Sequence, residues 1–148
     1  MAELFGHERL KVYQKGMQFA SLRKTLLDDL PRRVAACDHL DRGAESILLN
    51  IAHASSSWAP KERIVYLGNA SGSALECAAC LDIFVSRALV AGKDMDPGKS
   101  LLAEIVSMLV RMRETSHTSS HTLSSTLRRT LCRLFDLGGL SMDPLSVQ

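Results

Sequence analysis

Apolar residues recur at a helical spacing along almost the whole chain. No segment shows the alternation of apolar and polar residues that marks a half-buried strand. The clearest stretch runs from about Glu8 to Leu30 and has a period near 3.6. Its apolar positions are Val12, Tyr13, Gly16, Met17, Phe19, Ala20, Leu26 and Leu27. We expect Pro31 to end this helix, because proline disfavours helical geometry in the residue before it. The pattern predicts an all-α fold.

Three further helices are predicted from their start and stop signals. The second begins near Asp38 or Asp41, either of which can cap a first turn, and the Ser55–Ser57 run ends it. The third runs from Pro60 to about Ala91 and is closed by Gly92, and the Asp96-Pro97 pair opens the fourth. The expected inward-facing positions are Ala44, Ile47, Leu48 and Ile51, then Ile64, Leu67, Ser71, Leu75, Ala78, Leu81/Asp82, Val85 and Leu89, then Leu101, Leu102, Ile105, Met108, Leu109 and Met112.

Small residues fill the middle of the third helix, from Gly68 to Ala74. A glycine inside a helix costs up to about 1 kcal/mol relative to alanine. That cost is tolerable where another backbone packs closely, so this span predicts a tight helix crossing.

The composition of the C-terminal third predicts a change in organisation after residue 114. Residues 115–122 form a Ser/Thr/His tract typical of a linker. A short helical segment, Leu123 to Phe135, follows and is ended by Gly138-Gly139, with a loose tail beyond. Residues 1–114 are therefore expected to form an antiparallel up-and-down four-helix bundle, and residues 123–148 an additional short C-terminal helical segment with its tail.

The overall composition is that of a globular protein of one domain. The chain has 148 residues, of which 46% are apolar and 23% charged, and a formal net charge of +2. No secretory leader opens the sequence, and no apolar run reaches the ~20 residues of a membrane span. We therefore expect a cytoplasmic protein with no membrane partner, in which the four cysteines are thiols.

No motif in the sequence points to catalysis, a metal or a cofactor. Cys77 and Cys80 form a lone CxxC within a helix, where core packing is the favoured interpretation. His117 and His121 stand four residues apart but have no third ligand nearby in the sequence. Nothing resembles a phosphate-binding glycine loop or a catalytic triad. An enzyme with a dispersed site, for example around His53, remains an open alternative.

Three polar residues are expected in the core rather than in a functional site. Asn50 lies beside Ile47 and Ile51, so its amide must find partners on a neighbouring helix, with Ser71, Ser73 or Glu76 as candidates. Glu76 follows the small-residue span and is interpreted in the same way. Asn50, Ser73 and Glu76 are thus predicted to form a structural polar core.

Basic residues gather on the first helix, after it, and in the C-terminal third. We expect these positions to contact nucleic-acid phosphates, in a sequence-independent and salt-dependent manner. They are Lys11, Lys15, Arg23, Lys24, Arg32, Arg33, Arg111, Arg113, Arg128, Arg129 and Arg133. A solvated, ion-paired helix surface is the alternative interpretation.

Three segments resemble a known family in the same order along the chain. Phe5 with Leu10–Lys15 resembles the opening of the four helix bundle proteins named after ribosomal RNA intervening sequences. The second segment, Ala44–Ala52, reads AESILLNIA and is similar to that family's A-x-S-I-x-x-N-I-A signature. The third, Tyr66–Glu76, reads YLGNASGSALE and is similar to its F-L-x-x-A-x-G-S-x-x-E signature. The resemblance covers roughly Phe5 to Met112.

The resemblance implies a homopentameric ring or barrel of four-helix protomers. One branch of this family, the accessory variability determinants of diversity-generating retroelements, partners a reverse transcriptase and its template RNA. Five copies of a chain with net charge +2 would carry about +10 around one axis, a field suited to a polyanion. The leading hypothesis is a non-enzymatic, pentameric nucleic-acid-binding scaffold of this kind, with RNA or DNA backbone and a reverse transcriptase as partners. The alternative is a protein–protein interaction adaptor that does not bind nucleic acid.

Overall fold

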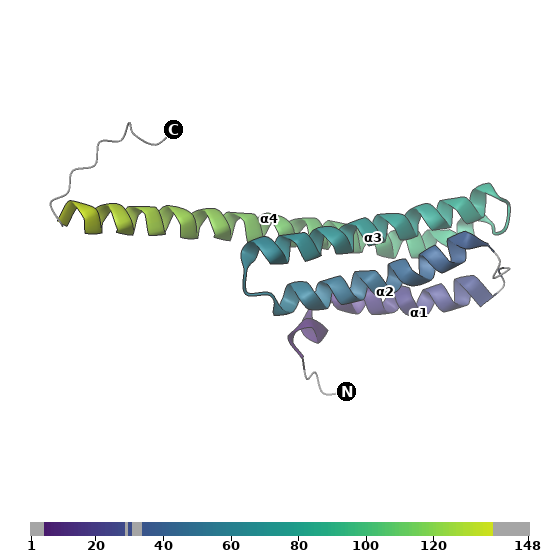
Figure 1. The fold of residues 1–148 in the computed structure, drawn as a ribbon. Helices are drawn as coiled ribbons and strands as arrows, with labels where there is room; N and C mark the ends of the chain where they lie inside the picture. The colour runs from purple at the N-terminus through teal and green to yellow at the C-terminus, as the bar shows by residue number, and fades with distance from the viewer. Residues whose placement is uncertain (1–4, 29, 31–33, 138–148) are drawn as a thin grey trace.

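The fold consists of helices joined by short connections (Figure 1). A computed structural model describes residues 5–28, 30 and 34–137, with side chains as far as His117. It contains a 3-10 turn, η1 (Gly6–Arg9), and four α-helices, α1 (Lys11–Asp28), α2 (Ala35–Ser56), α3 (Pro60–Ser86) and α4 (Gly92–Leu137). No strand occurs in these ranges, which confirms the all-α prediction.

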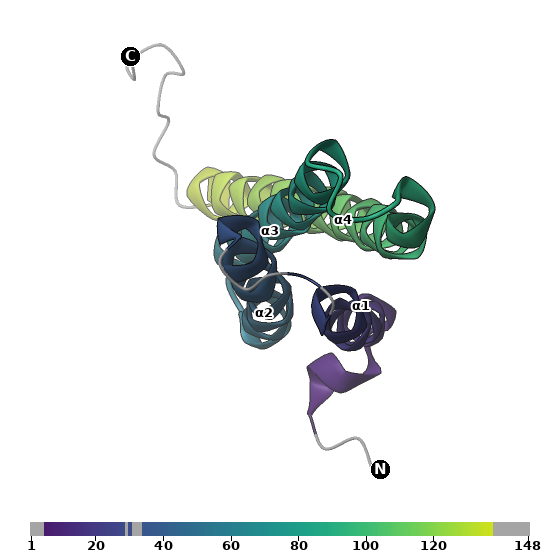
Figure 2. The same cartoon turned by 90° about the vertical axis from the view of Figure 1, so that its right-hand side faces the viewer.

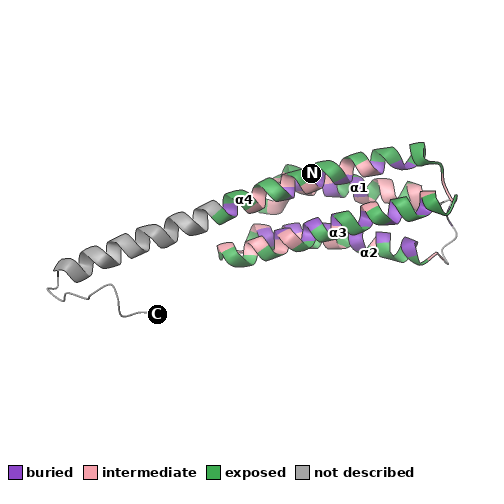
Figure 3. Cartoon of the chain, turned by 90° about the horizontal axis from the view of Figure 1, so that it is seen from above, coloured by how far each residue is buried: buried purple, intermediate pink, exposed green. Residues whose placement is uncertain are grey.

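The four helices pack in a closed cycle, α1 on α2, α2 on α3, α3 on α4 and α4 on α1. Seen end-on, they surround a common core (Figure 2). The last turn of α1, the first turn of α2 and the α3–α4 connection lie at one end, and the α2–α3 connection lies at the other (Figure 1). Each helix turns a buried stripe inward and an exposed one outward (Figure 3). The arrangement is consistent with a four-helix bundle. Its largest fully buried side chains include Phe19, Leu40, Ile47, Ile51, Leu67, Leu81, Phe84, Leu102, Ile105 and Leu109.

The first helix is shorter than its apolar pattern predicts. It begins at Lys11, because Leu10 is extended (φ −75°, ψ 123°) and separates it from η1. The Phe5 N–H donates to Glu8 Oε2 over 2.8 Å, which stabilises the separate turn. The second helix is longer than expected and begins at Ala35 rather than at Asp38 or Asp41. Its end at Ser56 agrees with the predicted stop.

The third helix ends five residues before the predicted Ala91. Ala88 adopts a left-handed conformation (φ 53°). The Leu89 N–H donates to Phe84 O and the Ala88 N–H to Val85 O, over 3.0 and 2.9 Å. This pair of bonds is the Schellman closure of a helix end. Gly92, expected to close α3, is instead the first residue of α4.

The fourth helix departs furthest from the sequence-based boundaries. It begins at Gly92, so that Pro97 lies within it, and it continues without a break to Leu137. The prediction of a linker at residues 115–122 is therefore wrong. The predicted C-terminal helical segment is a continuation of α4. Hydroxyls of the Ser/Thr tract bond to the helix itself, since Thr115 Oγ1 and Ser116 Oγ donate to Met112 O over 2.9 and 2.8 Å. Gly138-Gly139 and the tail lie outside the described residues.

The small-residue span of α3 divides between two faces. Ala70, Ser71 and Ala74 are buried, but a Cβ built at Gly68 or Gly72 would meet nothing within 4 Å. The expected tight crossing therefore does not occur at these glycines. The close approach of α2 to α3 occurs instead at Gly43, whose added Cβ would lie 2.7 Å from Cys77 Sγ.

Two apolar residues expected in the core lie outside it. Leu75 is 58% exposed and Met17 is 48% exposed. Both come from stretches in which apolar residues occur on more than one side of the helix, so the sequence pattern did not single out the inner side.

Candidate functional site

A polar ladder crosses the contact between α2 and α3. Ser46 Oγ and Ser73 Oγ share a hydrogen bond 2.8 Å long. Asn50 Nδ2 donates to Ser46 O over 2.8 Å and to Ser46 Oγ over 3.1 Å. Asn50 thus reaches the neighbouring helix through Ser46 rather than directly, and Ser46 is the member that sequence reasoning missed. The sequence signal was available, because Ser46 lies one helical turn before Asn50.

Glu76 lies beside this ladder but not in the core. Its side chain is exposed, contrary to the expected buried position, and it lines a groove with His39, Arg42 and Ser73. Position 76 lies on the outer side of α3, where a carboxylate keeps its hydration.

The basic residues of α1 divide into paired and exposed groups. Lys15 Nζ lies 2.8 Å from Glu104 Oε2 and ties α1 to α4. Arg23 Nη1 lies 2.7 Å from Asp41 Oδ1 and also donates to Asp41 O over 3.3 Å, which ties α1 to α2. Lys11 and Lys24 are exposed. Within residues 5–28, 30 and 34–117, no ion pair forms at either of these two lysines.

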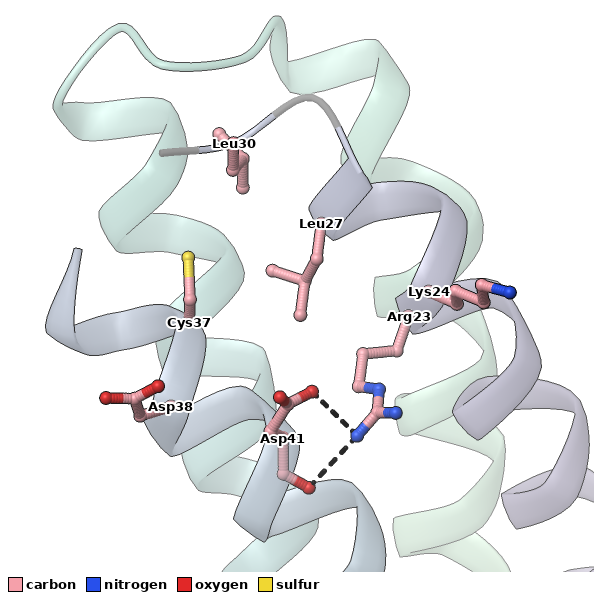
Figure 4. Close-up of a pocket in the computed structure, with 7 residues that line it drawn as sticks. All are labelled: Arg23, Lys24, Leu27, Leu30, Cys37, Asp38 and Asp41. Carbon is pink, nitrogen blue, oxygen red and sulfur yellow. Dashed lines mark hydrogen bonds and ion pairs between the residues drawn. The ribbon is translucent and has the colours of Figure 1, made fainter. Parts of the chain in front are cut away.

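The Arg23–Asp41 pair borders a small cavity between α1 and α2 (Figure 4). The cavity has a volume of about 170 Å³. Its lining mixes the apolar side chains of Leu27 and Leu30 with Lys24, Cys37 and Asp38. The arginine is thereby held within the protomer, so Lys15 and Arg23 are less suited to bind an external phosphate than Lys11 and Lys24.

The C-terminal basic residues are only partly described. Arg111 is exposed, and Arg113 is half-buried with its Nε lacking a partner in the described part of the chain. Arg32 and Arg33 lie outside the described residues, as do the side chains of Arg128, Arg129 and Arg133.

The described cysteines are buried thiols. Burial raises the pKa of the Cys77 thiol from 9.0 to about 12, with smaller contributions from Cys80 and Glu76 in the same direction. Burial also raises the pKa of Cys37 and of Cys80. Such thiols stay protonated and are poor nucleophiles. Among the described residues, no group of three or more histidine, cysteine or acidic side chains is placed to hold a metal ion.

The outer face of α3 exposes several large apolar side chains. Val65 and Leu75 are each 58% exposed, and Ile83 is 37% exposed. Gly68, Gly72 and Ala79 lie between them at helical spacing, and both glycines are open. We call these six residues the outer α3 stripe. Among the helices of the described residues, α3 is the one that is long and apolar enough to cross a membrane, judged by length and composition alone. The reason is that α3 carries the outer stripe in addition to its core face.

Aromatic side chains gather where α2 meets α3 and η1. Trp58, in the α2–α3 connection, is 99% exposed. The rings of His53 and Tyr66 stack with centroids 5.1 Å apart and planes at 20°. These three residues line one cavity of about 330 Å³. Sequence reasoning named His53 as a possible site residue but missed Trp58 and Tyr66, because the members come from two helices and a connection.

A family model matches residues 8–111, well over half of the chain, and is described as 23S rRNA-intervening sequence protein. The matched range contains all three signature segments apart from Phe5, and all of the polar ladder. The chain belongs to the 23S rRNA-intervening sequence protein family. Members are helical proteins, and neither the family description nor that of the similar structure below names an enzymatic activity.

The fold of this family member is similar to that of a solved structure. A protein of unknown function from Bacteroides thetaiotaomicron, assigned to the S23 ribosomal protein family, superposes with a TM-score of 0.62 at 22% sequence identity. The similarity covers 69% of this chain and 97% of the other. None of the curated proteins compared with the chain matches it. At this identity the comparison supports the fold alone.

Proposed function

We propose that this protein is a non-enzymatic, homo-oligomeric scaffold that binds nucleic acid. In this proposal antiparallel, up-and-down protomers assemble as a ring, a pentamer as the family resemblance implies. The scaffold serves in the cytoplasm as the accessory subunit of a diversity-generating retroelement reverse transcriptase, and holds the polymerase and its template RNA.

The exposure of the outer α3 stripe is the observation that supports an oligomer. Val65, Leu75 and Ile83 are large apolar side chains that the protomer's own core leaves partly exposed. Exposed apolar patches of this kind mark association sites. The open glycines at 68 and 72 would let a second helix approach the backbone closely, which accounts for their place in a helix that they destabilise by about 1 kcal/mol each.

The exposed basic residues support the nucleic-acid partner. Lys11, Lys24 and Arg111 are solvent-accessible, and the net charge of +2 is multiplied by the number of copies in a ring. Lys15 and Arg23 contribute less, since Glu104 and Asp41 already neutralise them.

A salt titration tests the proposal. The assembled full chain is titrated with structured RNA at several salt concentrations, and affinity is followed by fluorescence anisotropy. We expect log Kd to rise with log salt, and the triple substitution of Lys11, Lys24 and Arg111 by alanine to flatten the slope. Lys15→Ala is the matched control and should change the slope less. A Kd that does not change with salt concentration, or the absence of RNA binding at low salt, contradicts the proposal.

A protein–protein adaptor is the second candidate, and the length of α4 favours it. This helix runs beyond the ends of its neighbours (Figure 1). Its sequence there carries Leu123, Leu127 and Leu131 four residues apart, a spacing typical of helix-in-groove recognition. A chain truncated after Ser116 separates the two candidates. If the protein is the adaptor, the full chain binds no RNA and the truncated chain loses the protein partner. If it is the scaffold, the truncated chain keeps its ring and loses the part of its RNA affinity that Arg128, Arg129 and Arg133 supply.

A further inference from the structure

Trp58 and the stacked rings of His53 and Tyr66 form an aromatic surface, in which Tyr66 also packs against the core. Trp58 is 99% exposed, so its indole contributes almost nothing to the core. His53, at the end of α2, is exposed, and it lies flat against Tyr66 near the start of α3. A cavity of about 330 Å³ opens between these three side chains, Ser57 and Glu62.

The other exposed aromatic group of the described chain lies at the same end of the bundle. Phe5 stacks on His7 at 5.9 Å, and His7 packs edge-on against Tyr13 at 4.7 Å. Gly6 approaches Ser55 Oγ, which places this group against the end of α2 from which Trp58 follows. By contrast, the two other phenylalanines with described side chains, Phe19 and Phe84, are fully buried.

The exposed basic side chains at this end of the bundle favour an anionic ligand. Lys61 is exposed and immediately precedes Glu62 of the cavity lining in the sequence, and Arg9 and Lys11 are exposed and follow Phe5 within six residues. Glu62 is the one carboxylate that lines the cavity among the described side chains, and Ser57 Oγ donates to it over 2.6 Å. The α2–α3 connection also lies at the end from which α4 leaves the bundle (Figure 1).

We propose that Trp58, with the His53–Tyr66 pair, is a stacking site for an unpaired nucleotide of single-stranded RNA. This inference rests on the proposed nucleic-acid function and names the form of nucleic acid that the protein prefers. Unpaired bases stack on exposed aromatic rings, whereas paired bases in a duplex have their faces covered by their neighbours. Basic side chains around the rings hold the phosphates, and the rings hold the base.

The protein reports on this site directly, because Trp58 is its single tryptophan. The full chain is titrated with a 12-nucleotide unstructured RNA and with the corresponding fully paired duplex. We expect saturable quenching of Trp58 emission by the single strand and little by the duplex. By anisotropy, Trp58→Leu should weaken single-strand binding about 10-fold, which lies within the roughly 5- to 150-fold range that one stacked base contributes. Trp58→Phe should stay within about 3-fold of the wild type.

Leu49→Ala is the matched control, because Leu49 is a 61% exposed apolar residue of α2 outside the cavity. It should leave both affinity and quenching unchanged. RNA that binds without changing Trp58 emission, or equally well to Trp58→Leu, overturns the stacking site and leaves the nucleic-acid scaffold intact. If neither the single strand nor the duplex binds, both the stacking site and the nucleic-acid scaffold are overturned. Shielding of Trp58 from acrylamide in the RNA-free assembly also overturns the site, because another copy of the chain would then occupy it.

Discussion

Gly43 of α2 faces Cys77 of α3 so closely that a Cβ at position 43 would lie 2.7 Å from the thiol sulfur. The same Cβ would lie 3.5 Å from Ser73 O. Gly43 and Cys77 are both buried. The Cys77 thiol also donates to Leu40 O over 3.9 Å, so the sulfur has little room to move. This contact sets the distance between α2 and α3 beside the polar ladder.

Gly43→Ala should lower the free energy of unfolding by about 1–3 kcal/mol. The steric cost outweighs the gain of up to about 1 kcal/mol in helix propensity. Urea unfolding followed by circular dichroism measures the change. Combining Gly43→Ala with Cys77→Ala should recover part of the loss, because the second substitution removes the sulfur. A double variant whose losses simply add would contradict this account.

Ala88→Gly should raise the stability by about 0.5–1 kcal/mol. An L-residue in the left-handed region costs roughly 1–2 kcal/mol, and glycine's larger unfolded-state freedom offsets part of the gain. Thermal unfolding should show a higher Tm. Ala91→Gly is the control, since within the described residues Ala88 is the one non-glycine with positive φ. Stabilisation of equal size at position 91 would refute the assignment of strain to Ala88.

Leu75→Asp should dissociate the assembly and leave the helices folded. A carboxylate in the outer α3 stripe would have to be desolvated at the contact between copies, which is far more costly than its exposure in the free protomer. Analytical ultracentrifugation should show protomer mass, with unchanged helical circular dichroism. Ala91→Asp adds the same charge in the exposed α3–α4 connection and should not dissociate the assembly. An unaltered mass for Leu75→Asp would remove the stripe from the interface.

The buried thiol of Cys77 should make the protein less stable in alkali. Its folded-state pKa is about 12, above the unfolded value near 9.0, so the unfolded chain loses this proton first. Stability is therefore fully present below pH 9 and falls as pH rises toward 12, by at most about 1.4 kcal/mol per pH unit. Urea unfolding between pH 8 and 11 measures the slope. Other groups titrate in the same range, so the comparison is with Cys77→Ala, whose slope should be shallower. Identical slopes would mean that the thiol is not the cause.

The Ser46–Ser73 hydrogen bond should appear as a coupling between the two positions. A double-mutant cycle with Ser46→Ala and Ser73→Ala should give a coupling free energy of about 0.5–1.5 kcal/mol. Ser46→Ala should be the more costly single change, because it also removes the oxygen that accepts from Asn50 Nδ2. Strict additivity would show that the ladder does not join the two helices energetically.

The sequence predicted secondary structure best where a residue acts locally. Pro60 and the serines before it marked the start of α3 and the end of α2 to within a residue or two. The linker at residues 115–122 was predicted from composition, and it failed because hydroxyls such as that of Ser116 can bond to the preceding helical turn. Ala88 ends α3 through a backbone conformation that alanine rarely adopts, so no sequence signal announced it.

The candidate site was predicted in part. The sequence identified Asn50 and Ser73 as polar positions near the core, but not the Ser46 hydroxyl that joins them. From the sequence, Lys11, Lys15, Arg23 and Lys24 were predicted as equivalent basic positions. In the structure, Lys15 and Arg23 form ion pairs with Glu104 and Asp41 within the protomer. Of the aromatic cluster around Trp58, the sequence indicated only His53 as a possible site residue.

By itself, the sequence determined the all-α class, the number of bundle helices and the family, because helical periodicity, proline and serine positions and short signature runs are properties of neighbouring residues. Only the tertiary structure decided which side of α3 faces inward, that Gly43 rather than Gly68 or Gly72 receives the neighbouring helix, and that His53, Trp58 and Tyr66 share one cavity. These features depend on how each helix is rotated about its own axis and on which residues of other helices it meets. An apolar or small residue fits either side of a helix equally well, so only the packed partners distinguish the two.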